Sequence, residues 1–408
     1  MQRVIVSVVV MSMVFSCSIV EIGGDSGDRP SGGHIWGGMD SSQDGTPGLR
    51  TISYVTALDY QKGYDWRSDQ SVGSVKCSLV VYSDNVPVMK VPVGDAYEVS
   101  SDPDMHRIIG GHLYTDYSTE TETVIKKDGR QLFRYPGRES VCGLESIGDD
   151  IYILGQSREG SGFSLRKNGE TVISREDGYV IGSLVNDSDS LCFAFYERIR
   201  TADGFIGRYY AFVDGKVSQM ALRDDIVRIW DVAVRKDRII YLATLVGIPF
   251  PVVIDGGSMM TLAMPKGATV VSCRLFCSEE TVVVEGMYRL PDGKVVNALW
   301  QNGKMVSSFS GDQVISAIEI SDGGIFCVIN PSRYGESGKI YRAGEIFDIP
   351  RGYVVMGNGC VKVMDGIMNV GLSSTEGKSP MIWKDGQMDS LKINGYLSAI
   401  STTVSLPN

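Results

Sequence analysis

Arginine and tyrosine side chains recur at one kind of position in this 408-residue chain, where they could bind an anionic or sugar ligand. A guanidinium forms paired hydrogen bonds with a carboxylate, and an aromatic ring packs against cations and apolar faces. Four polar, glycine-containing stretches, GQSREGSG, ERIRTADG, MYRLPDG and NPSRYGESG, each hold one arginine, and tyrosines lie beside two of these. The predicted binding residues are Arg158, Arg200, Arg289, Arg333, Tyr288 and Tyr334.

The histidines and acidic residues give no clear catalytic set. The chain has only three histidines, and no nucleophile-elbow sequence accompanies His106 or His112. Acidic pairs such as Asp149 with Asp150 are expected in solvated turns. A glycosidase or lyase pair is brought together only in space, so it stays open as an alternative. We therefore predict no catalytic residue.

The cysteines predict neither a disulfide framework nor a metal site. Of eight cysteines, seven remain after Cys17, they are scattered, and none forms a CxxC pair. Most lie inside apolar runs such as SLCFAF and GIFCVI, where a free thiol behaves as a small apolar residue. We predict no metal and no cofactor.

A repeated pattern indicates how these residues are positioned. IWKDGQMDSL, around Trp383, has a near copy in LWQNGKMVSS, around Trp300. Its glycine recurs at intervals of 40, 46, 41, 47, 41 and 42 residues, at positions 129, 169, 215, 256, 303, 344 and 386, with a weaker copy at Asn85. Asp-Gly and Asn-Gly favour two-residue type I′ turns, because both residues must take positive φ. Each copy therefore predicts a β-hairpin.

A second strand-turn-strand pattern, such as WDVAVRKDRIIYLATL, lies between successive glycine turns. Four strands in a period of about 40 to 50 residues predict an all-β fold, a β-propeller of four-stranded blades. Eight turns favour eight blades, with seven as the alternative. The final segment, GYLSAISTTVSL, is expected to complete the N-terminal blade and close the ring, and Trp383 to pack between blades.

The N-terminal residues predict export. Residues 1–16 have the order of a secretory signal peptide, with Arg3, an apolar run and then small residues. Residues 14–17, Val-Phe-Ser-Cys, resemble a bacterial lipobox, which implies that Cys17 is the lipid attachment site. Phe15 departs from the small residues usual there, so plain secretion and an uncleaved anchor remain alternatives. Residues 17–48, rich in Gly, Ser and Asp, predict a flexible tether, and residues 49–408 a single propeller domain.

These features together resemble bacterial lipoproteins whose exported part is a β-propeller with degenerate W-K-[ND]-G hairpins. The resemblance implies export, a lipid anchor and a ring fold, and it supplies no catalytic residue. The motifs of WD40, kelch and Asp-box propellers are missing from the sequence.

The predicted function is a binding or protein-interaction scaffold at the bacterial envelope, on the outer-membrane, periplasmic or surface side. Its expected partner is an envelope protein or glycan, with membrane contact only through the anchor. A net charge of −10 argues against nucleic acid as a partner. The alternatives are a carbohydrate-active lyase or hydrolase with its site at the ring centre, and a structural part of an envelope complex. A dense cluster of ionisable residues at the channel would favour the enzyme, and a bland channel the scaffold.

Overall fold

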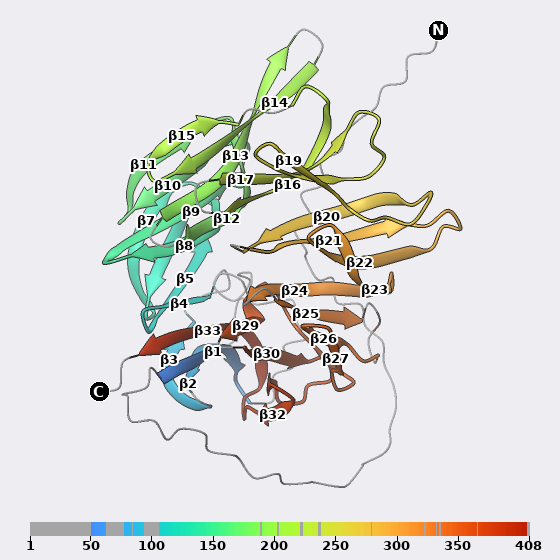
Figure 1. The fold of residues 1–408 in the computed structure, drawn as a ribbon. Helices are drawn as coiled ribbons and strands as arrows, with labels where there is room; N and C mark the ends of the chain where they lie inside the picture. Colours follow the sequence, from blue (N-terminus) through green and yellow to red (C-terminus); the bar gives the residue numbers. More distant parts are fainter. Residues whose placement is uncertain are drawn as a thin grey trace, which may run out of the picture.

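The chain forms a ring of eight antiparallel sheets, an eight-bladed β-propeller (Figure 1). The computed structural model describes residues 50–62, 77–83, 85–93, 106–187, 190–201, 204–220, 223–235, 238–278, 280–321, 324–331, 333, 336–364 and 366–405. The predicted all-β fold and the count of eight blades are confirmed. The predicted signal peptide, Cys17 and the whole predicted tether lie outside the described residues.

Blade 1 combines the C-terminal strand with the first three strands, and blades 2 to 4 then follow in chain order. Blade 1 combines β33 (Gly395–Ser405) with β1 (Arg50–Tyr60), β2 (Cys77–Ser83) and β3 (Val86–Pro92). Blade 2 holds β4 (Arg107–Ile109), β5 (His112–Ser118), β6 (Glu122–Lys127) and β7 (Arg130–Pro136). Blade 3 holds β8 (Glu139–Ile147), β9 (Asp150–Ser157), β10 (Phe163–Lys167) and β11 (Glu170–Arg175). Blade 4 holds β12 (Gly178–Asp187), β13 (Ser190–Thr201), β14 (Gly204–Val213) and β15 (Lys216–Gln219).

The last four blades repeat the same order. Blade 5 holds β16 (Ile226–Arg235), β17 (Arg238–Leu245), β18 (Val252–Asp255) and β19 (Ser258–Thr261). Blade 6 holds β20 (Thr269–Cys277), β21 (Val282–Arg289), β22 (Val295–Gln301) and β23 (Lys304–Ser310). Blade 7 holds β24 (Gln313–Ser321), β25 (Gly324–Pro331), β26 (Lys339–Arg342) and β27 (Glu345–Asp348). In blade 8, β28 (Tyr353–Val354) and β29 (Val361–Met364), separated by the 3-10 turn η3 (Asn358–Cys360), both pair with β30 (Ile367–Ser374), followed by β31 (Met381–Lys384) and β32 (Gln387–Ser390).

The C-terminal strand closes the ring, as predicted. β33 pairs antiparallel with β1, from Arg50 opposite Ser405 to Asp59 opposite Gly395. It is the first strand of blade 1, and the first strands of successive blades contact one another around the ring centre (Figure 1). The first strands therefore form the wall of the central channel.

The predicted glycine turns join the third and fourth strands of the blades. In six blades both turn residues have positive φ, and the first residue of each pair lies between 45° and 51°. These pairs are Asp128/Gly129, Asn168/Gly169, Asp214/Gly215, Asn302/Gly303, Ala343/Gly344 and Asp385/Gly386. In blade 5 the turn falls one residue later, on Gly256 and Gly257, because β18 includes Asp255. The type I′ geometry explains why Asp or Asn is favoured before Gly in this pattern.

The turn Asp or Asn also ties the outer hairpin to the second strand. In five blades its side-chain oxygen accepts a hydrogen bond from the backbone N–H at or beside the start of the second strand, at 2.8–3.1 Å. Asp214 thus accepts from Leu191, and Asn302 accepts from Val282. Blade 7 has Ala343 at this position, whose side chain has no acceptor. The motif therefore specifies both a turn and a contact across the sheet.

Replacing Ala343 by Asn is expected to stabilise the ring by about 1 kcal/mol. Alanine is strained at φ 47°, where asparagine is tolerated, and the new carboxamide would accept from the Ile325 N–H. Thermal unfolding of the Ala343→Asn variant checks this. Ala343→Gly is the matched control, since it relieves the strain without adding an acceptor. A melting temperature for Ala343→Asn at or below that of Ala343→Gly would contradict the capping role.

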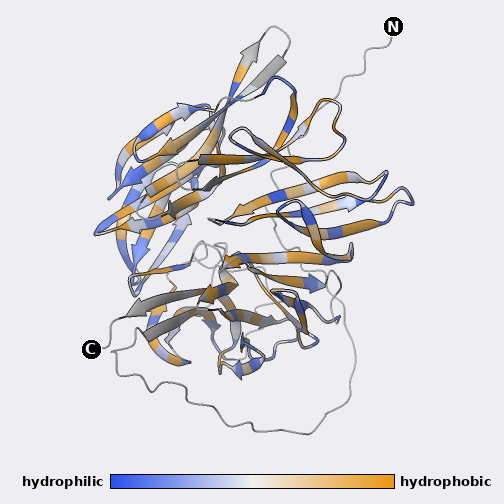
Figure 2. Cartoon of the chain, viewed as in Figure 1, coloured by the Kyte–Doolittle hydropathy of each residue, from blue (hydrophilic) through white to orange (hydrophobic). Residues whose placement is uncertain are grey.

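Large apolar side chains pack between neighbouring blades, while apolar and polar residues alternate along the strands (Figure 2). Trp383 is 1% exposed and packs with Val328 and Ile340 of blade 7, which confirms its predicted position between blades. Trp300 packs in the same way with residues of blade 5, and its indole N–H donates to the Ala263 carbonyl oxygen at 2.8 Å. The repeated aromatic position therefore joins blade to blade. None of the described residues forms a helix long and apolar enough to cross a membrane.

Candidate functional site

The ring has two ends, which the strand order distinguishes. Because each blade is an antiparallel meander, the connections from second to third strand lie at the same end as the connections from one blade to the next. We call this end the rim face. The opposite end, the turn face, carries the first-to-second and third-to-fourth turns.

The predicted arginines lie at the rim face. Arg158 is exposed in the β9–β10 connection, where its Nε donates to Ser140 Oγ at 2.7 Å. Arg289 ends β21, Arg333 lies in the β25–β26 connection, and both are exposed. Arg200 lies near the tip of the β13–β14 hairpin, and its side chain is outside the described part of the structure, as is Tyr334. Acidic Glu159, Asp292 and Glu336 share these connections, so the local charge is close to balanced.

Tyr288 occupies a different environment from the predicted rim. Its side chain is 4% exposed, and its ring lies 6.1 Å from that of Trp300 in the core between blades 5 and 6. Alternation along β21 explains this, because Tyr288 and its neighbour Arg289 point to opposite faces of the sheet. Tyr288 therefore contributes to packing, and the recognition role of the four arginines stays a prediction.

The strongest surface feature is a row of three tyrosines across blade 4, which we call the tyrosine row. Tyr179, Tyr196 and Tyr209 are direct cross-strand neighbours on β12, β13 and β14. Their rings stack at centroid distances of 5.1 Å and 5.7 Å. Gly207 leaves room for this arrangement, since a Cβ there would lie 3.2 Å from Tyr209 Cε2. All three tyrosines are half-buried, so one edge of each faces solvent.

One exposed arginine lies over the tyrosine row, and a second lies on the first strand of the next blade. The Arg198 guanidinium lies 5.2 Å from the ring centroid of Tyr179. Arg228, on β16, lies over the ring of Trp230 at 3.7 Å, and its charge acts to lower the pKa of Tyr209 against the larger raising effects of burial and of Tyr196. Within the described residues, neither guanidinium has a carboxylate partner. Both cations are thus held by aromatic rings with their hydrogen-bonding edges available.

The hairpin that carries the tyrosine row is longer than its counterparts. β13 has 12 residues and β14 has 10, against 8 and 4 for β17 and β18 of the next blade. The hairpin accordingly extends beyond its neighbours at the edge of the ring (Figure 1). Its lower part is covered by blade 5, since Ala194 packs with Val232 and Tyr241. Tyr196, two residues further along the same face, lies where this cover ends.

An open pocket of about 670 Å³ also lies at the rim face of blade 1, where β1 ends beside the start of β33. Its lining includes Lys62, Lys90 and Lys392, from three separate segments. Lys90 forms an ion pair with Asp59 at 3.2 Å, and Asn394 donates to the Gln61 carbonyl oxygen at 3.0 Å. Among the described residues of its lining, three lysines accompany one acid, so this part of the pocket is cationic.

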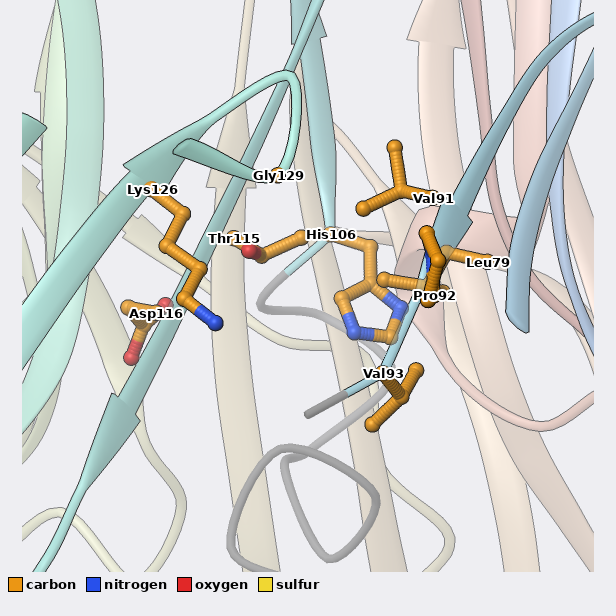
Figure 3. Close-up of a pocket in the computed structure, with 9 residues that line it drawn as sticks. All are labelled: Leu79, Val91, Pro92, Val93, His106, Thr115, Asp116, Lys126 and Gly129. Carbon is orange, nitrogen blue, oxygen red and sulfur yellow. The ribbon is translucent and has the colours of Figure 1, made fainter. Parts of the chain in front are cut away.

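A small internal cavity surrounds His106 between blades 1 and 2 (Figure 3). Its volume is about 10 Å³, close to the least that holds one water. Burial lowers the pKa of His106 to about 4, so the imidazole is neutral at pH 7. His112 contacts Asp128 at 2.7 Å beside a blade turn. The surroundings of His106 and His112 are therefore those of residues that stabilise the fold.

Six charged residues on six of the first strands form a group that we call the collar: Arg107, Glu145, Asp231, Arg274, Glu319 and Lys362. Most of their charges are engaged with one another or with the backbone. Arg107 lies 3.8 Å from Glu145, and Lys362 pairs with Glu319. Arg274 pairs with Glu285 of β21, and Asp231 accepts from the backbone N–H groups of Leu275 and Val232 at 2.7 Å and 2.8 Å.

Charges from different blades act on one carboxylate of the collar. Burial raises the pKa of Glu145, whereas the charges of Arg107 and Lys362 lower it. Glu145 belongs to blade 3, Arg107 to blade 2 and Lys362 to blade 8. Burial also raises the pKa of Asp231 and of Glu285. The channel is therefore charged rather than bland, and its charges are largely satisfied internally.

The collar predicts how stability depends on pH. Because Glu145, Asp231 and Glu285 have raised pKa values, folding favours their protonated forms, and their ionisation costs stability as pH rises through the folded-state values. We therefore expect the melting temperature to increase from about pH 7 to about pH 5. The exposed carboxyls Asp150, Asp225 and Asp312 have lowered pKa values, so their contribution is lost only at more acidic pH.

Melting curves of the wild type and Glu145→Gln check this expectation. The variant should gain stability at pH 7 and show a shallower rise toward pH 5. A melting temperature that falls steadily over this range, or an unchanged slope in the variant, would contradict the assignment to buried collar carboxyls.

The thiols show little nucleophilic character. All seven cysteines from Cys77 onward are free, and five are buried. Burial raises the pKa of Cys77 and of Cys142 to about 11, and that of Cys273 to about 12. Among the described residues, no group of three or more His, Cys, Asp or Glu could hold a metal ion.

The spacing of two tyrosines in the sequence could have predicted part of the tyrosine row. Tyr196 and Tyr209 are equally far from the turn between β13 and β14, so a two-residue turn there places them opposite each other. The pairing of Tyr179 could not be counted in this way, because the β12–β13 register shifts between Ile181 and Val185.

Comparison with known proteins shows structural likeness at low sequence identity. The β-propeller domain of the Trilobed protease from Pyrococcus furiosus is 13% identical with a TM-score of 0.40, covering 84% of this chain and 92% of that domain. The polysaccharide lyase Uly1 is 9% identical with a TM-score of 0.41, covering 88% and 99%. A puromycin-hydrolysing peptidase from Mycobacterium tuberculosis is 9% identical with a TM-score of 0.46, covering 74% of this chain and 54% of that protein.

No protein-family model matches the sequence, and no curated protein matches it. At these identities and TM-scores, the activities of the similar structures do not transfer to this chain.

Proposed function

We propose that this protein is an extracytoplasmic binding scaffold, held to the bacterial envelope by an acylated Cys17, whose rim face binds an envelope glycan or protein. The tyrosine row carries this proposal. It presents three stacked tyrosine rings with the Arg198 guanidinium over one of them, on a hairpin longer than that of the next blade. Aromatic and arginine side chains are the residues that most often dominate recognition surfaces.

The position of this surface fits a tethered scaffold. The chain enters blade 1 at Arg50, after the predicted tether of residues 17–48. The cationic pocket of blade 1 lies at the same face as the tyrosine row. Two separate features at this face therefore favour ligands with negatively charged groups. A flexible tether would leave the rim face free to reorient toward a ligand.

The collar supports a second candidate, a carbohydrate-active enzyme acting at the channel. Glu145 combines a raised pKa with two nearby cations, which is a property of general acids. In this alternative, Glu145 would donate a proton to a leaving group, and its replacement by Gln would abolish turnover. The collar's internal pairing favours the scaffold, because those charges already have partners.

One experiment separates these candidates. The full chain, purified in mild detergent, is applied to an array of neutral and acidic glycans, while the supernatant is assayed for new reducing ends. Retention without cleavage, lost in Tyr196→Ala and kept in Tyr152→Ala, supports the scaffold. Tyr152 is a matched control, a half-buried tyrosine under Lys167 at the turn face. Cleavage that disappears in Glu145→Gln would establish the enzyme, and neither binding nor cleavage would contradict a glycan-binding role.

A further inference from the structure

Building on the proposed function, we infer that the tyrosine row is a binding site for an acidic polysaccharide chain, which crosses β12, β13 and β14 with a carboxylate held by Arg198. The tyrosine row has unused hydrogen-bonding groups. Within the described residues, the hydroxyls of Tyr179, Tyr196 and Tyr209 have no hydrogen-bond partner. A ligand would meet three phenolic donors in a line.

The geometry favours an extended ligand over a small molecule. Cross-strand neighbours lie on a line perpendicular to the strands, so the three hydroxyls follow a path from the channel wall at β12 outward to β14. Small-molecule sites are usually concave, whereas this row is on an exposed hairpin. A polymer lying across the sheet could contact all three edges at once.

Arg198 favours an acidic ligand. Other arginines of the sheets have carboxylate partners, such as Arg166 with Glu139 and Arg274 with Glu285. Arg198 instead rests on the ring of Tyr179, which leaves its N–H edge for a bidentate contact with a ligand carboxylate.

The chemistry of the row selects among acidic polymers. The chain has a net charge of −10, so an anionic ligand must gain affinity from contacts other than charge alone. A uronic-acid polymer combines a carboxylate for Arg198, hydroxyls for the tyrosine oxygens, and apolar ring faces for the aromatic edges. An acidic peptide shares only the first of these properties.

The test uses the full chain with oligogalacturonate, the same oligomer after methyl esterification, and poly-glutamate as probes, measured by calorimetry. Oligogalacturonate should bind, and its affinity should fall as salt increases. Arg198→Gln should weaken binding about 10- to 100-fold, since it removes a charged hydrogen-bond donor pair. Tyr196→Phe, which keeps the stacking, should cost a few-fold, roughly the effect of one neutral hydrogen bond.

Arg208→Gln is the matched control. Arg208 is exposed on β14 beside Tyr209 and, by strand alternation, points to the opposite face, so its replacement should leave affinity unchanged. Equal binding of the methyl ester, or poly-glutamate binding as tight as oligogalacturonate, would overturn the acidic-polysaccharide assignment. If neutral glycans bind through Tyr196, the proposed function stands without this inference. If no glycan binds at all, both fail.

Discussion

Deletion of residues 395–408 is expected to leave a chain that cannot form a stable ring. The deletion removes β33, whose Tyr396, Leu397 and Ile400 are at most 8% exposed. Burial of a large apolar side chain contributes about 1.5–3 kcal/mol, so these three account for roughly 5–9 kcal/mol, comparable to the whole stability of many domains. The deletion also exposes the edge of β1 along the channel, where it could pair with other chains.

Size-exclusion chromatography and thermal unfolding would measure this effect. We expect aggregation or a non-cooperative transition for the truncated chain. Deletion of residues 406–408 alone is the control, because it leaves β33 complete. A truncated chain that remains monomeric with an unchanged melting temperature would show that closure by β33 is dispensable.

Replacement of Arg166 by Ala is expected to destabilise the protein by about 3–5 kcal/mol. Arg166 donates two hydrogen bonds to the Glu139 carboxylate, at 2.7 Å and 2.9 Å, and its guanidinium lies 3.8 Å from the ring centroid of Tyr135 in blade 2. The side chains of Arg166 and Glu139 are 10% and 12% exposed, so the variant would leave a carboxylate almost unsolvated and unpaired.

Denaturant unfolding measures the stability of this variant and of two further variants that serve as comparisons. The double variant Glu139→Gln with Arg166→Met should recover much of the loss, because both charges are removed together. Arg175→Ala breaks the more exposed pair with Glu197, and should cost at most about 1 kcal/mol. Equal losses for Arg166→Ala and Arg175→Ala would contradict a special role for the buried pair.

Local sequence patterns predicted the blades because each blade is made of local hairpins. The turn glycines marked the third-to-fourth connections, and their regular spacing gave the number of blades. The lone C-terminal strand predicted the closure with β1, because an unpaired strand and an incomplete first blade need each other. These inferences needed only turn chemistry and strand alternation.

The site depends on contacts that the repeat does not encode. The stacking of Tyr179 on Tyr196 follows from a register shift in β12, and the same pairing brings Tyr179 under the guanidinium of Arg198. Tyr288 illustrates the same limit, since one position separates a core ring from an exposed neighbour on β21. The composition of the loops predicted that four arginines lie at one end of the ring, but it did not predict which side chains contact one another there.

The seam between β1 and β33 has a mechanical consequence. Arg50, where the chain enters the ring, is opposite Ser405, and β1 lies between β33 and β2. A pull on the N-terminal segment along β1 would load the hydrogen bonds to both neighbouring strands together, perpendicular to their direction. Such shear distributes force over many bonds, whereas an edge strand would peel open one bond at a time. A ring anchored through its N-terminal segment is therefore held where it best resists being pulled apart.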